Sequence, residues 1–362
     1  MKNNIRIQTP ARICLFGDHQ DYLELPVIAC TIDRYINLTA EENDSLEFRI
    51  LMPDIDTERS IDISEPFEIL EKEDYFASSL RVLRRYDCIP NKGYTITIKS
   101  KIPINAGVSS SSALVIAWVH FLLKAFGCSS KINSELIAKI AYKAEVLEHN
   151  SPGGKMDQFS IALGDIIFID TSDEFSIQKI GTLMNGLIIG ESGIPKETIG
   201  LLGDLRGKAQ KAVHCIQKQF QGFKLEQVLE DEIDKYTSLV PENLLPIFIA
   251  AVKNHLITQA ALKEFNKKPL DYNKIGRLMN EHHTLLKNNL KITVPKIDAM
   301  IDAAIKAGAY GAKIVGSGGG GSIVALSPPS KENDIKNAII NAGAKCAYLV
   351  KVTNGSQIVL NA

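Results

Sequence analysis

Apolar and polar residues alternate along the first hundred residues with the period of β-strands. Residues 5–13, 26–38 and 94–99 carry this pattern, and the last segment alternates with a period of two. Successive side chains of a strand point to opposite faces, so each of these segments can bury one face against a core. The N-terminal part is therefore expected to begin as a sheet.

The pattern then changes to that of helices. Residues 113–126 are almost continuously apolar, and residues 134–149 carry apolar positions at helical spacing, with Glu148 expected to face solvent. These helices would cover one face of the sheet. Residues 165–170 predict a short buried strand, and a loop at 171–181 precedes another strand at 186–190. A domain boundary is expected here, giving domains of residues 1–183 and 184–362.

The C-terminal half is helix-rich over residues 202–289. Helical and strand patterns then alternate in residues 295–307, 312–315, 322–326, 332–342 and 347–352. This order predicts a two-layer α+β arrangement. A chain of 362 residues is also too long for one typical core, so two domains with a cleft between them are expected.

Composition excludes several classes of function. Charged residues make up 23% and no apolar run reaches the roughly 20 residues that span a bilayer, so no membrane role is expected. Residues 1–7 lack a secretory leader, which indicates a cytoplasmic protein. The net charge of −1 gives no field that would recruit nucleic acid. The six cysteines are scattered and predict neither disulfides nor a structural metal: Cys14, Cys30, Cys88, Cys128, Cys215 and Cys346.

A serine-rich loop precedes the first predicted helix. Four consecutive serines follow Gly107 and Val108, and the apolar helix begins directly afterwards. Free backbone N–H groups at a helix N-terminus bind anions, and a glycine lets the chain turn tightly. The same serines could simply cap the helix. No Gly-Lys-Ser/Thr follows, so the loop is not a Walker A motif.

A second glycine-rich segment, residues 311–322, lies between two predicted strands near the C-terminus. Its glycines permit positive φ angles and the close approach of another group. A flexible hairpin turn would have the same composition. Two such loops far apart in sequence could close on one ligand.

Two groups of charged residues are candidates for chemistry. Asp157 follows a Pro-Gly-Gly turn and could accept a hydroxyl proton, with Glu145 on the preceding helix as a metal ligand; on spacing alone, Asp157 is better explained as a helix cap. Arg12 lies in an apolar strand that leads into Asp18, His19 and Asp21. This cluster could bind a polyol, although Arg12 could form a surface ion pair and His19 could be structural.

Together these segments resemble the GHMP kinases, and the galactokinase branch in particular. Residues 10–22 resemble the first motif and the sugar signature Gly-Glu-His-x-Asp-Tyr, and residues 105–113 resemble the phosphate loop. Residues 154–158 match Gly-x-Met-Asp-Gln, and 311–322 resemble the third motif. The resemblance implies an α+β fold with an N-terminal domain like ribosomal protein S5 domain 2 and a ferredoxin-like C-terminal domain.

The resemblance also implies a role for each site residue. Asp157 would be the catalytic base with Arg12 as its partner, and Ser111, or Ser110, with Glu145 would bind Mg²⁺. The groups expected to contact sugar hydroxyls are Asp18, His19 and Asp21. The residues expected to bind ATP are Asn105, Ala106, Gly107, Val108, Ser109, Ser110, Ser111, Ser112, Gly318 and Gly319.

Two departures from the family pattern concern the substrate. Asp18 replaces the glutamate of the signature, and Ile194 stands where a tyrosine that contacts the sugar is expected. The leading hypothesis is an ATP-dependent kinase that phosphorylates the C1 hydroxyl of a neutral galacto-configured aldose. The alternatives are a mevalonate or heptose-phosphate kinase, and a sugar sensor without catalysis. The sequence does not indicate an oligomeric state.

Overall fold

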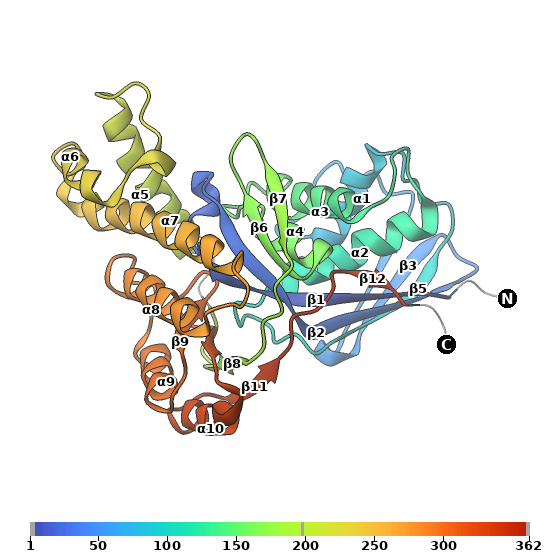
Figure 1. The fold of residues 1–362 in the computed structure, drawn as a ribbon. Helices are drawn as coiled ribbons and strands as arrows, with labels where there is room; N and C mark the ends of the chain where they lie inside the picture. The colour runs from blue at the N-terminus through green and yellow to red at the C-terminus, as the bar shows by residue number, and fades with distance from the viewer. Residues whose placement is uncertain (1–3, 197–198, 360–362) are drawn as a thin grey trace.

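The larger of two sheets forms the N-terminal part of the molecule in Figure 1. The structure is a computed structural model and describes residues 4–196 and 199–359. Within these residues the sheet has the order β12-β1-β2-β5-β3-β4, and β6 and β7 continue from β2. Its strands are β1 (Asn4–Phe16), β2 (Val27–Glu42), β3 (Glu47–Met52), β4 (Thr57–Asp62), β5 (Tyr94–Ser100), β6 (Ile166–Asp170), β7 (Ser176–Ile180) and β12 (Gln357–Ile358).

Strands β1 and β2 form a long antiparallel pair that carries the first motif. Arg12 lies opposite Thr31 in this register, close to an irregularity between Pro10 and Ala11. The second half of β1 is buried without interruption. A strand buried on both faces holds its side chains in fixed positions, so β1 is a rigid support for Arg12.

Four helices cover one face of the large sheet. They are α1 (Tyr75–Arg84), α2 (Ser110–Phe126), α3 (Ser134–Tyr142) and α4 (Met156–Leu163). Helix α2 contacts β1 and β2 as well as the other three helices. It is apolar on nearly all sides because it lies between the sheet and these helices. Trp118 of α2 packs edge-on against Phe48 and Phe76 in the main core.

The second sheet is antiparallel and lies in the C-terminal part. Its strand order is β11-β8-β10-β9. The strands are β8 (Leu187–Glu191), β9 (Gly311–Val315), β10 (Ser322–Leu326) and β11 (Cys346–Val350). The helices of this part are α5 (Ile199–Gln217), α6 (Ile233–Thr237), α7 (Leu245–Phe265), α8 (Tyr272–Asn288), α9 (Pro295–Lys306) and α10 (Glu332–Asn341). Helices α9 and α10 pack on this sheet, whereas α5 to α7 extend to the upper left of the molecule in Figure 1.

The mixed α+β, two-part architecture predicted from the sequence is confirmed. The chain passes from the first sheet to the second between β7 and β8, near the predicted boundary at residue 183, but β12 returns to pair with β1. The hairpin of β3 and β4 and helix α1 were not predicted. Glu148 was wrongly expected to face solvent, because its side chain is only 8% exposed and pairs with Arg81 and Arg85.

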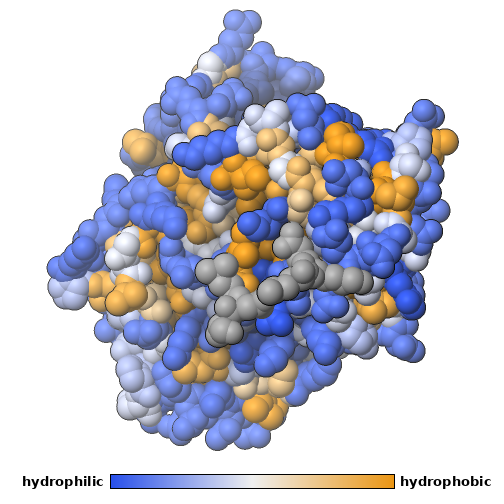
Figure 2. Space-filling model, turned by 90° about the vertical axis from the view of Figure 1, so that its right-hand side faces the viewer, coloured by the Kyte–Doolittle hydropathy of each residue, from blue (hydrophilic) through white to orange (hydrophobic). Residues whose placement is uncertain are grey.

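One helical stretch bears on membrane association. Residues Glu242–Phe265 are long and apolar enough to cross a membrane, and 56% of the most apolar window is buried inside the protein. Burial of this kind is typical of a core helix. On the face shown in Figure 2, hydrophilic side chains predominate and hydrophobic ones occur in small groups.

Candidate active site

A bidentate ion pair between Arg12 and Asp157 lies at the centre of the candidate site. Nε of Arg12 is 2.8 Å from Oδ1 of Asp157, and Nη2 is 2.9 Å from Oδ2. Nη1 of Arg12 donates to the carbonyl oxygen of Gly107, also at 2.8 Å. Arg12 is therefore not a surface residue, and its guanidinium links β1 to both α4 and the serine-rich loop.

Asp157 is not a helix cap, because Lys155 occupies that position of α4. Burial by itself would raise the pKa of Asp157, but the charge and hydrogen bonds of Arg12 lower it to a net value below the ordinary range. The hydroxyl of Ser109 adds a further hydrogen bond. Asp157 is thus ionised at neutral pH and can accept a proton, and 27% of its side chain is open to the cleft.

The serine-rich loop leads into the N-terminus of α2. Ser109 occupies the cap position with a φ of 59°, but its hydroxyl binds Asp157 instead of capping the helix. The first turn of any helix has N–H groups without partners in the helix. Ser111 borders the cleft there, so these groups are available to an anion.

The two glycine-rich loops pack directly against each other. Gly107 has a φ of +83°, and a Cβ at this position would lie 2.5 Å from the carbonyl oxygen of Val315. A Cβ on Gly316 would likewise lie 2.9 Å from the carbonyl oxygen of Gly107. Gly318 packs on Ile292, and the N–H of Gly319 donates to the carbonyl of Ile292. In this structure these glycines allow segments of the protein backbone to pack closely against each other.

Glu145 lies beside the same helix N-terminus. It belongs to a π-helical segment, Lys143–Leu147, a feature often found at functional sites. The hydroxyl of Ser112 donates to Glu145 Oε1 at 2.9 Å, and Gln158 Nε2 donates to Oε2 at 2.6 Å. Burial raises the pKa of Glu145, and the hydroxyl of Ser111 also interacts with this carboxylate. Carboxylate and hydroxyl oxygens thus gather where the loop meets α2.

Asp18 binds the C-terminal part of the chain. Lys313 Nζ lies 2.7 Å from Asp18 Oδ2, and the N–H of Gly316 donates to Oδ1 at 3.1 Å. Both side chains of the ion pair are at most 1% exposed. Burial would raise the pKa of Asp18, and Lys313 lowers it below the ordinary value. Both carboxylate oxygens thus have partners within the protein.

His19 is also bonded within the protein. Its Nε2 lies 3.0 Å from the carbonyl oxygen of Ser317, and its Nδ1 lies 3.3 Å from the hydroxyl of Tyr22. Burial lowers the pKa of His19, so the ring is neutral. These contacts are those of a structural histidine, and they leave few polar atoms of His19 for a substrate.

Asp21, the second acid of this cluster, borders both the cleft that contains Asp157 and a smaller neighbouring cavity. Burial, followed by the nearby charge of Asp157, raises the pKa of Asp21 to about 6. Its carboxylate packs against the turn before α4, because a Cβ on Gly154 would lie 2.0 Å from Asp21 Oδ2. A larger residue at position 154 would therefore displace the side chain of Asp21.

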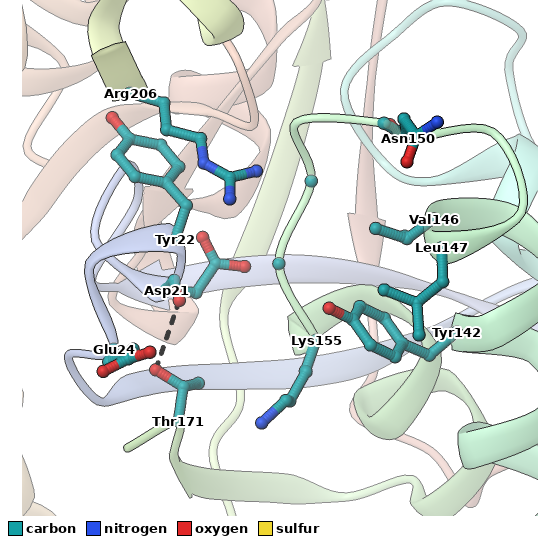
Figure 3. A pocket seen from close by; sticks show the side chains of 13 residues that line it. Asp21, Tyr22, Glu24, Tyr142, Val146, Leu147, Asn150, Lys155, Thr171 and Arg206 are labelled. Carbon is teal, nitrogen blue, oxygen red and sulfur yellow. Dashed lines mark hydrogen bonds between the residues drawn. The ribbon is translucent and has the colours of Figure 1, made fainter. Parts of the chain in front are cut away.

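These groups surround a cleft of about 680 Å³ lined by Arg12, Asp21, Ser111, Glu145 and Asp157, among others. A smaller cavity of about 320 Å³ lies beyond Asp21 and the turn at residues 150–154. In Figure 3, Arg206 and Asp21 turn their head groups toward the same space, and Tyr142 lies on the opposite wall. Charged and polar side chains thus border both spaces.

Lys196 is one of the cleft residues that the sequence analysis did not consider. Lys196 borders the cleft, and its pKa is lowered by burial, against a raising effect of Asp157. It follows Ile194-Pro195 in the segment that was compared only with a sugar-binding tyrosine motif. A lysine after an apolar strand and a turn carries no distinctive sequence signal, so spacing alone did not identify it.

The comparisons with known proteins agree with this geometry. Residues 74–165 match the family description "GHMP kinases N terminal domain", and residues 259–345 match "GHMP kinases C terminal". The mevalonate kinase of Thermococcus sibiricus is 27% identical over 343 residues, which are 92% of each chain. The galactokinase of Chloroflexus aggregans is 27% identical over 346 residues, 92% of this chain and 86% of that protein.

Solved structures show the same fold. Lactococcus lactis galactokinase, complexed with galactose, superposes with a TM-score of 0.87 at 22% identity, covering 98% of this chain and 95% of that one. Methanococcus jannaschii mevalonate kinase superposes with a TM-score of 0.73 at 21% identity, covering 97% and 99%. Since both domain descriptions match in order along one such fold, the chain belongs to the GHMP kinase superfamily and is an ATP-dependent small-molecule kinase.

Proposed function

We propose that this kinase transfers the γ-phosphoryl group of ATP to the C1 hydroxyl of a neutral galacto-configured aldose. The observation that carries the proposal is the ionised Asp157, fixed by Arg12 between the serine-rich loop and a polar acceptor cleft. Phosphoryl transfer needs the acceptor oxygen placed in line with the donor and the charge neutralised. Asp157 orients the acceptor hydroxyl and takes its proton.

The serine-rich loop is the proposed ATP site. Residues Asn105 to Ser112 give a tight turn and a helix N-terminus, which suits the triphosphate. Gly316 and Gly321 support this loop by packing against Gly107 and Ala106, whereas Gly318 and Gly319 contact Ile292. The cytoplasm, where ATP is abundant, is the proposed location.

Mg²⁺ fits the group of oxygens beside this loop. Glu145 offers a buried carboxylate with a raised pKa, and Ser111 and Ser112 offer hydroxyls next to it. A hard divalent cation prefers such oxygen ligands and would relieve the cost of burying the charge of Glu145. When bound, the ion neutralises phosphate charge, while Asp157 and Arg12 remain the groups that face the acceptor.

The preference for a neutral acceptor rests on Asp21 and Asp157. Both carboxylates border the part of the cleft where we propose that the acceptor binds, which we call the acceptor side. An anionic substrate without a matching cation there would be repelled by these charges and would lose its hydration. Asp18 and His19 stay in the proposal as residues that shape the pocket, although their hydrogen-bond partners belong to the protein. Ile194 supplies no hydroxyl, which leaves room for variation in the sugar.

Mevalonate is the second candidate acceptor, because several of the similar curated proteins are mevalonate kinases. Measuring ADP release with a panel of neutral aldoses, galacturonate and mevalonate separates these candidates. We expect turnover of a galacto-configured aldose, with galacturonate much poorer. Efficient turnover of mevalonate or galacturonate without turnover of any neutral aldose would overturn the sugar assignment, and no turnover at all would favour a sensor.

A further inference from the structure

The segment between β8 and α5 is held in place by the glycine run of the third motif. Ser192 donates from its N–H and its hydroxyl to the carbonyl of Gly321, at 2.9 and 2.7 Å. The N–H of Gly321 donates back to the carbonyl of Ile194 at 2.8 Å. A Cβ on Gly320 would lie 2.6 Å from the carbonyl oxygen of Pro195. Glycine is therefore needed there so that this segment can approach.

The same segment also contacts the phosphate loop. The N–H of Lys196 donates to the carbonyl of Asn105 at 3.1 Å. The backbone of Lys196 is thus fixed between two loops whose positions the packed glycines determine. Its side chain reaches the cleft that contains Arg12, Glu145 and Asp157.

Arg12 is already engaged by other groups. Three of its nitrogens donate hydrogen bonds, two of them to Asp157 and one to Gly107. Its charge is therefore largely matched by the carboxylate beside it. By contrast, the ammonium of Lys196 has no hydrogen bond or ion pair with any residue that the structure describes.

The electrostatic need of the reaction matches the position of this ammonium. In the transfer, the bond from phosphorus to the bridging oxygen of ADP breaks, a bond to the acceptor oxygen forms, and the acceptor proton passes to Asp157. Negative charge spreads over the three other oxygens of the transferring group. That group must lie between the phosphate loop, which the backbone N–H of Lys196 contacts, and Asp157, whose charge interacts with the Lys196 ammonium.

We propose that Lys196 is a catalytic residue whose ammonium contacts the transferring phosphoryl group, while Arg12 chiefly fixes Asp157. This assignment rests on the proposed placement of ATP and Asp157, but it does not depend on which acceptor is used. It also gives the glycine run of the third motif a function, because these glycines position the segment that carries the lysine.

The test compares Lys196→Met and Lys196→Arg with Lys211→Met, a change at an exposed lysine of α5. Removing one preorganised donor to a developing charge typically costs ~10²–10³ in rate. We expect Lys196→Met to lower kcat by that factor. The KM of the acceptor and the Kd of a non-hydrolysable ATP analogue should stay close to wild type, Lys196→Arg should keep part of the rate, and Lys211→Met should match wild type.

A second measurement separates catalysis from a structural role. Adding methylammonium or ethylammonium to Lys196→Ala should restore part of kcat, because a small cation can occupy the space of the missing ammonium. Rates are measured with the fastest acceptor of the panel and also as ATP hydrolysis without acceptor. A failed sugar assignment therefore leaves this test intact.

Three results would overturn the proposal. The first is that Lys196→Met retains more than about a third of the wild-type kcat, because loss of such a donor should lower kcat at least ~10²-fold. The variant could instead raise the acceptor KM at unchanged kcat, which would assign the lysine to an anionic group of the acceptor. Failure of amines to rescue Lys196→Ala, together with an inactive Lys196→Arg, would show that the lysine is structural.

Discussion

The cleft has two proposed sides: a phosphoryl side next to the serine-rich loop, and an acceptor side next to residues 18–21. They differ in whether the polar side chains of each side bond to one another or to other parts of the chain. On the phosphoryl side, Arg12 and Ser109 both bond to Asp157, whose carboxylate borders both sides and joins three segments. On the acceptor side, Asp18 and His19 bond to the C-terminal part of the chain, and Asp21 faces the cleft with a raised pKa. Under the proposed function, the chemistry of transfer thus rests on a preorganised network, whereas few groups remain to select the acceptor.

The largest expected effect of a single change is at Asp157. Asp157→Asn keeps the shape of the side chain but removes the proton acceptor and the partner charge of Arg12. General-base contributions are typically ~10²–10⁴-fold, so kcat should fall by at least ~10²-fold. The acceptor Kd, measured by calorimetry, should be nearly unchanged. Retention of more than about a third of kcat would break the contrast between the two sides.

Substitutions at the predicted metal ligands should have the next largest effects. Glu145→Gln, Ser111→Ala and Ser112→Ala each remove or neutralise an oxygen near the predicted Mg²⁺ position. We expect each to raise the Mg²⁺ concentration for half-maximal activity by roughly tenfold or more, a typical cost of disturbing a metal site. Ser130→Ala, a change at an exposed serine beyond the C-terminal end of α2, is the comparison. Titration curves of all variants that superpose on wild type would exclude a metal at Glu145.

Asp21 should affect acceptor binding in preference to turnover. A hydrogen bond to a charged group contributes roughly 1.5–3 kcal/mol, so Asp21→Ala should raise the acceptor KM at least about tenfold with a smaller change in kcat. The same contrast should appear with pH. The pKa of Asp21 is raised to about 6, so Asp21 takes up a proton as pH falls through that value, whereas Asp157, with its lowered pKa, stays ionised.

The acceptor KM should therefore rise below about pH 6 while kcat changes less. In Asp21→Asn this acid limb should be absent, because the amide does not titrate. Profiles of KM against pH for wild type and Asp21→Asn check both statements. Identical profiles for the two proteins would mean that another group sets the pH dependence.

A smaller effect is expected at the turn that supports Asp21. A Cβ on Gly154 would lie 2.0 Å from Asp21 Oδ2, whereas the nearest contact for one on Gly153 is 3.8 Å. Gly154→Ala should displace the Asp21 carboxylate and raise the acceptor KM by roughly threefold or more, since small displacements in a site are costly. Gly153→Ala should be close to wild type. Equal KM values in both variants would contradict this role of Gly154.

How far the sequence predicts the molecule depends on the range of the contacts. Strands and helices with clear periodicity, such as residues 94–99 and 113–126, were predicted because local pattern determines which face is buried. Asp18 was assigned to the sugar from its place in the motif, and its contact with Lys313 was not predicted because the two residues are 295 positions apart. A contact between residues so far apart in sequence depends on how the two parts of the fold pack together, and no local sequence pattern predicts that packing.

The same limit applies to the glycine run and to Lys196. Glycines predict freedom of the backbone, but the structure shows that the missing Cβ atoms make room for Ile194, Pro195 and Gly107. Lys196 becomes a candidate catalytic residue only because the fold brings these segments together near Asp157. The resemblance to the GHMP kinases predicted Arg12 as the partner of Asp157, and the structure brings these two side chains together. Such a prediction is possible because both residues lie in short motifs of fixed spacing.

The most direct test of the central claim is the position of the phosphate in the product. Phosphorus NMR of the product from a galacto-configured aldose and ATP should show one resonance coupled to the anomeric proton, and Asp157→Asn should give no product on the same time scale. A phosphorus coupled to the methylene of mevalonate, with no product from any neutral aldose, would contradict the proposed function.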